Sequence, residues 1–185
     1  MRLNLGCGNS PREGWTNVDL TPGDGVDIVC NLDDGALPLP DDSVDESFGS
    51  HVLEHLHRPL DFMAELWRVT KPGGRVVFQL PYGSSDDAWE DPTHTRPYFI
   101  QSAAFFGQPA YWRADYGYTA DWSTRTVQLD VPRDRYDGCP DEQLIAEIQS
   151  LRNVVRQMTL ELVAEKPQRE RVRLNTPPPI VFRLV

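Results

Sequence analysis

Two glycines and a later aspartate are the first residues of this chain whose types and spacing suggest chemistry. Gly6 and Gly8 follow the strand-like run Leu3–Leu5, and Asp19 ends a second short run. Glycines after a first strand let a ligand approach the backbone closely, because no side chain intervenes. A carboxylate at the end of the second strand can accept two hydrogen bonds from ribose hydroxyl groups. The spacing therefore predicts a nucleoside site in which Asp19 is the strongest single candidate.

Two common phosphate-binding loops do not match this bend. The dinucleotide fingerprint needs a third glycine, but Pro11 holds that position. The Walker pattern needs a Gly-Lys-Ser/Thr sequence, and none follows. The bend is therefore not predicted to hold a pyrophosphate or a nucleoside triphosphate.

A histidine motif later in the chain suggests a rival chemistry. His51, Glu54 and His55 form the H-x-x-E-H arrangement of inverted zinc peptidases, in which histidines at i and i+4 share one helical face. Pro59 follows His55 within about one turn, and no acidic third ligand follows on a second helix. We therefore expect no metal site, and a zinc hydrolase using His51, Glu54 and His55 is kept only as a remote alternative.

The elements that must position these residues alternate as stacked βα units of a parallel sheet do. One helix is predicted over Pro59–Val69, and the glycine-rich stretch Lys71–Gly74 is predicted to form a tight turn. A short helix is expected over Arg96–Phe106, after a polar segment, 83–95, that is interpreted as a lid or a substrate-facing loop. Strands are expected at Arg2–Leu5, Thr16–Asp19, Asp27–Cys30, Val44–Gly49, Arg75–Leu80, Tyr111–Tyr118, Thr124–Val131 and Ile180–Val185.

A long helix is expected from about residue 142 to 165. Its apolar residues repeat with alternating spacings of four and three, as in a coiled-coil seam. The stripe packs either on its own domain or against a second copy, so a homodimer through this helix is one of the two interpretations. The seam residues are Leu144, Ile148, Leu151, Val155, Met158 and Leu162.

Composition limits the partners. The chain has 185 residues, with 18 Lys and Arg against 28 Asp and Glu, which gives a net charge of −10. Such a charge repels polyanions, so nucleic acid is an unlikely partner. No apolar run is long enough for a membrane span and no signal-peptide layout is present, so a cytoplasmic protein without a membrane partner is expected. The cysteines Cys7, Cys30 and Cys139 are predicted to be free thiols.

Taken in order, these motifs resemble class I S-adenosylmethionine-dependent methyltransferases, specifically small type 11-like members. The resemblance covers about residues 2–82 and implies an α/β, Rossmann-like, seven-stranded, mostly parallel sheet of order 3-2-1-4-5-7-6 with helices on both faces. The nine residues between Leu5 and Trp15 are too few for the usual first helix, so the fold is expected to be truncated at its N-terminus. The motifs are Gly6-Cys7-Gly8-Asn9, Trp15–Asp19, Leu37–Asp45, Ser50–Leu56 and Lys71–Gly74.

The resemblance implies S-adenosylmethionine as the cofactor and S-adenosylhomocysteine as the product. It implies that the glycine bend holds the methionine part, that Asp19 holds the ribose, and that residues after the second, third and fourth strands complete the pocket. The cofactor-binding residues implied in this way are Gly6, Cys7, Gly8, Asn9, Asp19, Leu20, Leu32, Asp33, Ser50 and His51.

His94 lies just beyond the fifth strand, where the resemblance implies that a methyl acceptor approaches. A neutral imidazole suits a modest base, so His94 is the candidate catalytic or acceptor-orienting residue, although a structural role beside Asp91 is equally open. Tyr82 and Arg96 are secondary candidates for shaping the acceptor site.

The predicted function is methyl transfer to a small-molecule acceptor by in-line displacement. Arg169, Arg171 and Arg173 form a basic stretch, which leaves protein or RNA acceptors open. A catalytically silent protein that binds S-adenosylmethionine or S-adenosylhomocysteine and regulates a partner is the alternative. We expect residues 1–185 to be a single methyltransferase domain, with a cofactor-binding half over 2–82 and an acceptor-side half over 83–185.

Overall fold

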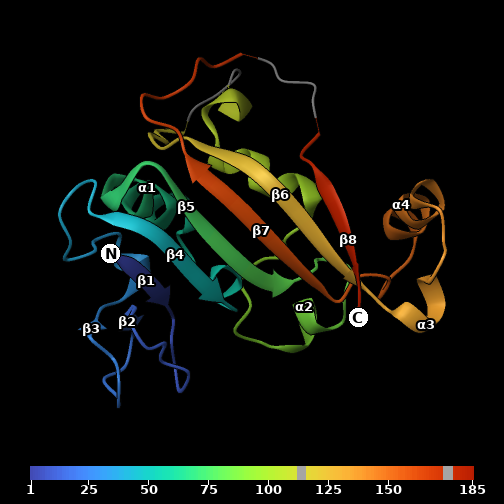
Figure 1. Ribbon diagram of the computed structural model, residues 1–185, viewed down its shortest axis with the longest axis horizontal. Coiled ribbons are helices and arrows are strands. Elements are labelled where there is room, and N and C mark those ends of the chain that lie inside the picture. The colour runs from blue at the N-terminus through green and yellow to red at the C-terminus, as the bar shows by residue number, and fades with distance from the viewer. Residues whose placement is uncertain (112–115, 173–176) are drawn as a thin grey trace.

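The structure, a computed structural model, is built on one eight-stranded sheet (Figure 1). It describes residues 1–111, 116–172 and 177–185. The strand order is β3-β2-β1-β4-β5-β7-β6-β8, so the predicted order is confirmed and β8 is added at one edge. The strands are β1 (Arg2–Leu5), β2 (Thr16–Asp19), β3 (Ile28–Val29), β4 (Val44–Ser50), β5 (Thr70–Pro81), β6 (Trp122–Val131), β7 (Gln157–Ala164) and β8 (Ile180–Leu184).

The sheet is mostly parallel. Strands β1 to β5 pair in parallel, β7 runs antiparallel between β5 and β6, and β8 pairs in parallel with β6. The carboxyl ends of β1, β2, β4 and β5 therefore meet along one edge. In open α/β sheets this edge, where the strand order reverses beside β1, is where ligands bind.

Helix α1 (Pro59–Val69) spans the predicted residues and packs its apolar side on the sheet. Proline at its first position has a backbone angle already suited to a helix, and Phe62, Met63 and Leu66 are almost fully buried. The ring of Phe62 meets that of Phe78 on β5 edge to face. The shorter helices are α2 (Asp87–Glu90), α3 (Arg133–Tyr136) and α4 (Asp141–Ser150), and the 3-10 turns are η1 (Leu32–Asp34), η2 (Leu53–His55), η3 (Ile100–Phe106) and η4 (Gln108–Tyr111).

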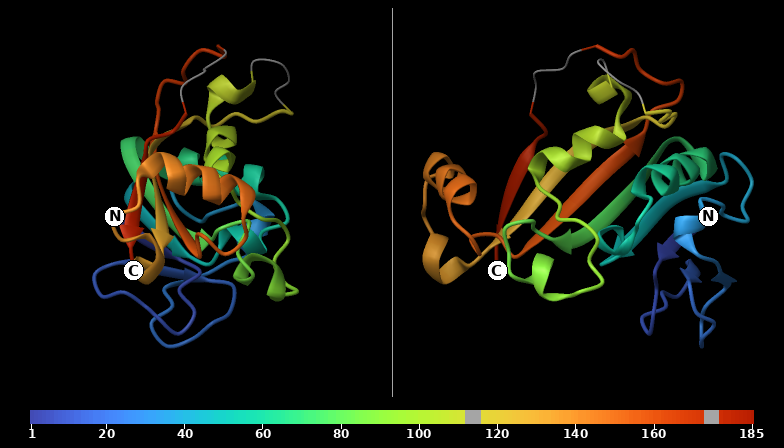
Figure 2. Two further views of the ribbon diagram at one scale, coloured as in Figure 1. Left: turned by 90° about the vertical axis from the view of Figure 1, so that its right-hand side faces the viewer. Right: turned by 180° about the vertical axis from the view of Figure 1, so that it is seen from behind.

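In the described part of the chain, helices cover one face of the sheet. Figure 1 shows the strands in front of α1, and the view from behind in Figure 2 shows α1 and the η3 segment over the strands. The family resemblance implied helices on both faces. Nine residues between Leu5 and Trp15 and eight between Asp19 and Ile28 are too few to cross the sheet with a helix.

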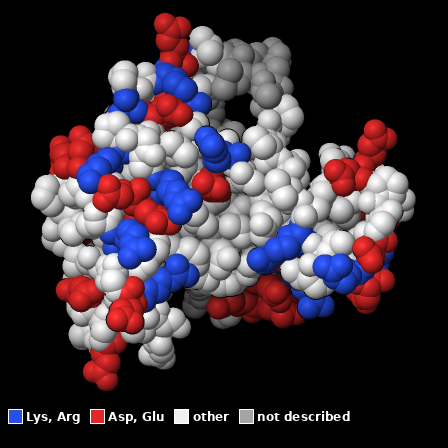
Figure 3. Space-filling view, viewed as in Figure 1, with Lys and Arg blue, Asp and Glu red and all other residues white. Residues whose placement is uncertain are grey.

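The other face is polar and solvated. Charged side chains of both signs are interspersed over the strands in Figure 3. A cross-strand ladder illustrates the pattern: Arg75 on β5 lies 2.7 Å from Glu46 on β4 and 3.8 Å from Glu161 on β7. The buried residues of β5, including Phe78, point to the opposite side. The sheet therefore buries one face only, which is unusual for parallel strands.

The predicted helix over 142–165 is wrong beyond residue 150. Helix α4 ends at Ser150, Leu151 is exposed, and residues 157–164 form β7. Alternate residues of β7 are buried, a period of two that shares Met158 and Leu162 with the heptad seam. Leu144 and Ile148 are buried within the chain itself. The seam that suggested a homodimer therefore does not exist as one helical stripe.

Three other predicted elements differ. The glycine turn at Lys71–Gly74 lies inside β5 as a bulge, because Val44 pairs with Thr70 and Glu46 with Arg75. The helix expected over Arg96–Phe106 is a 3-10 segment over its second part. The strand expected at Tyr111–Tyr118 is absent from its described ends, and residues 112–115 lie outside the described part.

No helix in the described residues has the length and apolar character needed to cross a bilayer.

Candidate functional site

The glycine bend after β1 has the geometry that its residues predict. Gly6 and Gly8 both have positive φ angles, +59° and +48°. A Cβ atom on Gly6 would lie 2.6 Å from Cγ2 of Val52, whereas nothing lies within 4 Å of the Cβ position at Gly8. Position 6 therefore has to be glycine, because a side chain would clash with Val52. At Gly8 the backbone borders open space.

Asp19 lies against this bend. The backbone N–H of Gly8 donates to Oδ2 of Asp19 at 2.7 Å. The backbone N–H and the hydroxyl of Thr21 donate to Oδ1 at 3.0 and 3.2 Å. The end of β2 is therefore fixed to the loop after β1, and the Asp19 side chain stays partly exposed.

The protonation of Asp19 follows from these contacts. Partial burial raises the pKa of the carboxyl, but the hydrogen bonds from Thr21 and Gly8 outweigh it and lower the pKa below its usual value. Asp19 is therefore ionised at neutral pH. An ionised carboxylate is an acceptor only, which suits it to ribose hydroxyl groups.

A pocket of about 300 Å³ opens at the carboxyl ends of β1, β4 and β5. The guanidinium of Arg12 stacks over the ring of Phe48, with its central carbon 3.5 Å from the ring centroid. Arg12 thus places a positive charge at this pocket. The lining residues are Asn4, Gly6, Cys7, Ser10, Arg12, Phe48, Ser50 and Gln79.

Arg12 is a site candidate that sequence reasoning missed. It lies in a loop without periodicity. Its guanidinium lies 5.3 Å from the ring centroid of Trp15, but the closer ring, that of Phe48, is 36 positions later in the chain. Its only sequence signal is a cation within the segment that connects the glycine bend to Asp19.

Ser50 ends β4, and His51 follows it at the same edge. The backbone N–H of His51 donates to the carbonyl of Gln79 at 2.8 Å. His51 has a φ of +55°, an uncommon backbone conformation for a residue with a side chain. Such conformations persist where the surroundings fix them, and they cluster at binding sites.

The remaining predicted cofactor residues have mixed surroundings. Cys7 is buried, and burial together with the charge of Asp19 raises the pKa of its thiol. Asn9 and Leu20 are exposed, and Leu32 packs partly on the core. One Asp33 oxygen accepts the backbone N–H of Arg58 at 2.9 Å, which places a negative charge at the start of α1. Asp33 therefore has a structural role at the start of α1. Its contact with adenine stays a prediction.

The histidines do not form the inverted zinc-peptidase site. His51 precedes the 3-10 turn η2, so His51 and His55 are not on one face of an α-helix as that site requires. Instead, the ring of His55 meets the ring of His94 edge to face, with centroids 4.8 Å apart. Nδ1 of His51 lies 3.1 Å from Oε1 of Glu54, and this carboxylate raises the pKa of His51.

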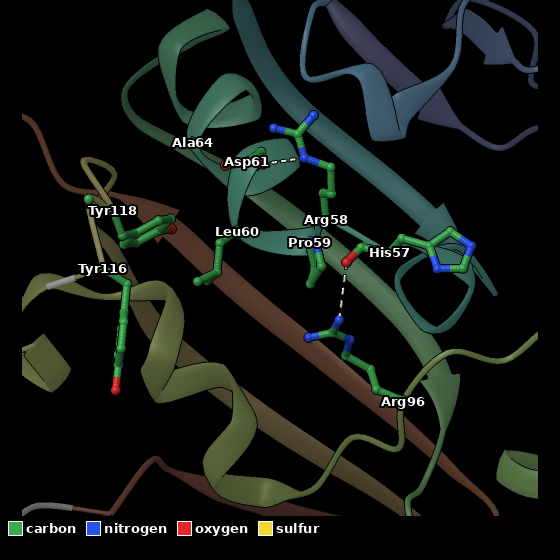
Figure 4. A pocket seen from close by; sticks show the side chains of 10 residues that line it. His57, Arg58, Pro59, Leu60, Asp61, Ala64, Arg96, Tyr116 and Tyr118 are labelled. Carbon is green, nitrogen blue, oxygen red and sulfur yellow. Dashed lines mark hydrogen bonds and ion pairs between the residues drawn. The ribbon is translucent and has the colours of Figure 1, made fainter. Parts of the chain in front are cut away.

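The predicted acceptor residues lie beyond β5. Tyr82 is buried beside Phe99, and burial raises the pKa of its hydroxyl. The guanidinium of Arg96 donates to the carbonyl of His57 at 3.2 Å (Figure 4). Arg96 borders two neighbouring pockets, each of about 270 Å³, that share Leu60 and Tyr116 among their lining residues.

The predicted basic stretch is largely engaged inside the molecule. Arg169 forms an ion pair with the buried Asp121 at 2.6 Å, and Nε of Arg171 donates to the side chain of Gln108 at 2.7 Å. Arg173 lies outside the described residues. The two described arginines thus have a structural role.

Comparison with known families finds similarity in one segment of the chain. Residues 16–78 match the model of a methyltransferase domain. This segment is similar to the methyltransferase domain family over about a third of the chain. An uncharacterized methyltransferase of Mycobacterium bovis is 60% identical over 56 residues, and one of Mycobacterium tuberculosis is 57% identical over 56 residues. Each match covers 28% of this chain and only 22% of the relative's length.

Solved methyltransferase structures share the fold along most of the chain. A S-adenosylmethionine-dependent methyltransferase from Archaeoglobus fulgidus superposes with a TM-score of 0.59 at 17% identity, covering 88% of this chain and 85% of that one. The one from Mesorhizobium loti gives a TM-score of 0.56 at 15% identity, covering 88% and 90%. The resemblance to class I methyltransferases is confirmed, and S-adenosylmethionine is the cofactor that this family and fold imply.

Proposed function

We propose that this protein transfers a methyl group from S-adenosylmethionine to a small-molecule acceptor. The observation that carries the proposal is the contact between Asp19 and the N–H of Gly8, which joins an ionised carboxylate to a bare backbone cradle. This cradle lies at the sheet edge where the family and fold imply the cofactor. A nucleoside with a charged amino-acid tail fits both parts.

The ribose is assigned to Asp19. A carboxylate offers about four lone-pair directions, and Gly8 and Thr21 use three of them. One direction is free for a ribose hydroxyl, and the hydroxyl of Thr21 is the mobile group that a second ribose hydroxyl can replace. Leu20, Leu32 and Asp33 remain the predicted adenine-side residues.

The amino-acid part is assigned to the pocket beside the glycine bend. The guanidinium of Arg12 suits the methionine carboxylate, because guanidinium and carboxylate groups form strong charge-assisted hydrogen bonds. The backbone near Ser50 and His51 suits the ammonium group, as does the peptide oxygen of Gly6. Asn9 flanks the same loop. This arrangement would point the sulfonium toward the ends of β4 and β5.

The acceptor is assigned to the two pockets beside Arg96. Their shared lining is apolar and aromatic, with one cation, which favours a small molecule that has an apolar body and an anionic or polar group. The net charge of −10 argues against nucleic acid as the acceptor. Tyr82 shapes this side of the site, and His94 orients the acceptor or accepts its proton.

The chemistry needs alignment more than acid–base power. The acceptor's lone pair forms the new bond to the methyl carbon while the electron pair of the S–C bond stays on sulfur, and the acceptor proton leaves to a base or to solvent. Holding donor and acceptor in line supplies much of the rate acceleration in such displacements. In this scheme residues 2–82 bind the cofactor, and residues 83–185 present the acceptor together with the start of α1, as one domain.

A cytoplasmic location accompanies this proposal. The three described cysteines are free, which suits a reducing compartment.

Thermal denaturation with candidate ligands tests the proposal. S-adenosylmethionine and S-adenosylhomocysteine should stabilise the protein by about 2.7 kcal/mol at one hundred times their dissociation constants, and NAD should not. Asp19→Ala should abolish most of this shift, whereas Asp134→Ala, on exposed α3, should retain it. An equal shift for both variants would remove Asp19 from the site. Ligand binding without methyl transfer to any acceptor in a small-molecule panel would favour the silent regulatory alternative.

A further inference from the structure

Three side chains with metal-binding atoms converge beside the acceptor region. Glu54 and His55 lie on η2 after β4, and His94 lies in the segment after α2. One ligand atom from each residue lies within 4.8 Å of the others. The backbone N–H of Thr95 donates to the carbonyl of Glu54 at 2.7 Å, and the Thr95 hydroxyl donates to the carbonyl of Leu56 at 2.7 Å. Two segments distant in sequence are thereby held together at this cluster.

Glu54 is buried without the partners that a buried carboxylate needs. It is 1% exposed, and neither carboxylate oxygen has a hydrogen-bond partner among the described residues. Oε1 lies 3.1 Å from Nδ1 of His51, but without hydrogen-bond alignment, and Oε2 has no such neighbour. An uncompensated buried charge is costly, so buried carboxylates are normally paired or bound to a metal. Protonated His51 is the one cationic side chain recorded beside Glu54 among the described residues, and it faces Oε1 only, so Oε2 of Glu54 is left without a partner there.

The hydrogen bonds of His55 fix which ring nitrogen is free. The Thr93 hydroxyl donates to Oδ1 of Asp91 at 2.6 Å, because the ionised carboxylate can only accept. Having donated its single hydrogen, the same hydroxyl must accept at its 2.9 Å contact with Nδ1 of His55. Nδ1 of His55 therefore carries the proton. In the neutral ring the lone pair is on Nε2.

The hydrogen bond of His94 also fixes which of its ring nitrogens carries the proton. Its Nδ1 lies 3.2 Å from the carbonyl oxygen of Ala88, and a carbonyl can only accept, so this nitrogen is the donor. The lone pair of the neutral ring is again on Nε2, which lies 3.9 Å from Oδ2 of Asp91, beyond hydrogen-bond distance. Histidines that bind metals commonly donate their other nitrogen to a carbonyl or to a carboxylate network, as His94 and His55 do here.

We propose that Glu54, His55 and His94 bind a divalent transition-metal cation of the zinc class. Two imidazoles and one carboxylate form a donor set suited to zinc and to other first-row metals. Three protein ligands leave a coordination position open, as in catalytic rather than structural sites. The ligand set differs from the H-x-x-E-H site, because His94 replaces His51 as the second histidine and Glu54 is itself a ligand.

The role of this site rests on the proposed function, although its existence does not. An acceptor with an ionisable hydroxyl group would occupy the open position. Coordination lowers the pKa of such a hydroxyl, whose proton then leaves to solvent. The oxygen lone pair forms the bond to the methyl carbon, and the electron pair of the S–C bond remains on sulfur. His94 then orients the acceptor through the metal and is not the base.

Metal titration of the full, metal-free chain tests the proposal. We expect one zinc ion per chain by calorimetry, and a cobalt(II) complex whose visible spectrum shows nitrogen and oxygen ligands. Glu54→Gln and His94→Ala should each weaken binding by more than the roughly 10- to 100-fold typical of losing an outer hydrogen bond. Thr93→Val, which removes the outer partner of His55, should fall within that range. His57→Ala, an exposed histidine two positions from His55, is the matched control and should bind as the wild type does.

Folding of the variants is checked separately. Glu54→Gln keeps the side-chain volume and removes the unpaired charge, so its melting temperature without metal should equal or exceed that of the wild type. A lower melting temperature together with unchanged zinc affinity would show a purely structural Glu54 and overturn the proposal. Absence of zinc and cobalt binding by the folded wild-type chain would also overturn it.

Cofactor binding by the same samples separates the two proposals. S-adenosylhomocysteine bound without any metal site would contradict this inference and leave the proposed function intact. Metal binding without cofactor binding would contradict the proposed function and leave the metal site intact.

Discussion

At the residue scale, the cofactor cradle depends on where two backbone groups point. Gly8 and Thr21 direct N–H groups at Asp19, so the carboxylate is charged and oriented before any ligand arrives. Asp19 and the glycines were predictable because they act within one loop and one strand end. Arg12 was not, because its position depends on Phe48, which the fold brings from a distant strand.

The lowered pKa of Asp19 predicts how the stability of the fold responds to pH. The carboxyl of an unfolded chain has a pKa of about 3.9. Because the folded value is lower, the contribution of Asp19 to stability is present above about 3.9 and is lost as the pH falls through the folded pKa. The carboxyl-carbon shift of Asp19, followed by NMR, should titrate below the usual range. A midpoint above about 4 would contradict the contacts described here.

At the element scale, β7 shows why one prediction was wrong. A buried strand with a period of two and a helix with a period near 3.5 can both bury residues that are four positions apart, such as Met158 and Leu162, so a short apolar series fits both. The decisive facts are tertiary: β7 fills the space between β5 and β6, with pairing on both sides. Asn153, in a left-handed conformation just after α4, is the local signal that the helix stops. By contrast, α1 has a proline start and a complete apolar side, and its bounds were predicted.

Two leucines distinguish the strand from the helical seam. Leu160 is outside the seam but fully buried on β7, whereas Leu151 is in the seam but 45% exposed. Leu160→Ala should lower the free energy of unfolding by about 2–5 kcal/mol, and Leu151→Ala by less than about 0.5 kcal/mol. Chemical denaturation measures both. The opposite ranking would support the continuous helix.

At the scale of the whole molecule, the sheet is covered on one side only. Short connections replace the helices that would pack on the front face in Figure 1, and charged side chains occupy that face instead (Figure 3). The strand order was predictable from the order of the motifs, because it follows the family. The nine-residue connection before Trp15 predicted that one helix is missing. It did not predict that the whole face is uncovered, because loop length alone does not show what covers a sheet.

Substitutions on the two faces of β5 should differ in cost. Phe78 is buried against α1, so Phe78→Ala should cost about 3–5 kcal/mol of unfolding free energy. Arg75 pairs with Glu46 at the solvated surface, so Arg75→Ala should cost less than about 1 kcal/mol. Urea denaturation compares the two. A large loss for Arg75→Ala would indicate that this face is covered in solution.

A crystal structure of the chain with S-adenosylhomocysteine tests the central claim most directly. We expect the ribose hydroxyls on Asp19, the amino-acid tail beside Gly6, and its carboxylate at Arg12. Ligand density elsewhere on the molecule, with the side chain of Asp19 still bonded only to Gly8 and Thr21, would contradict it.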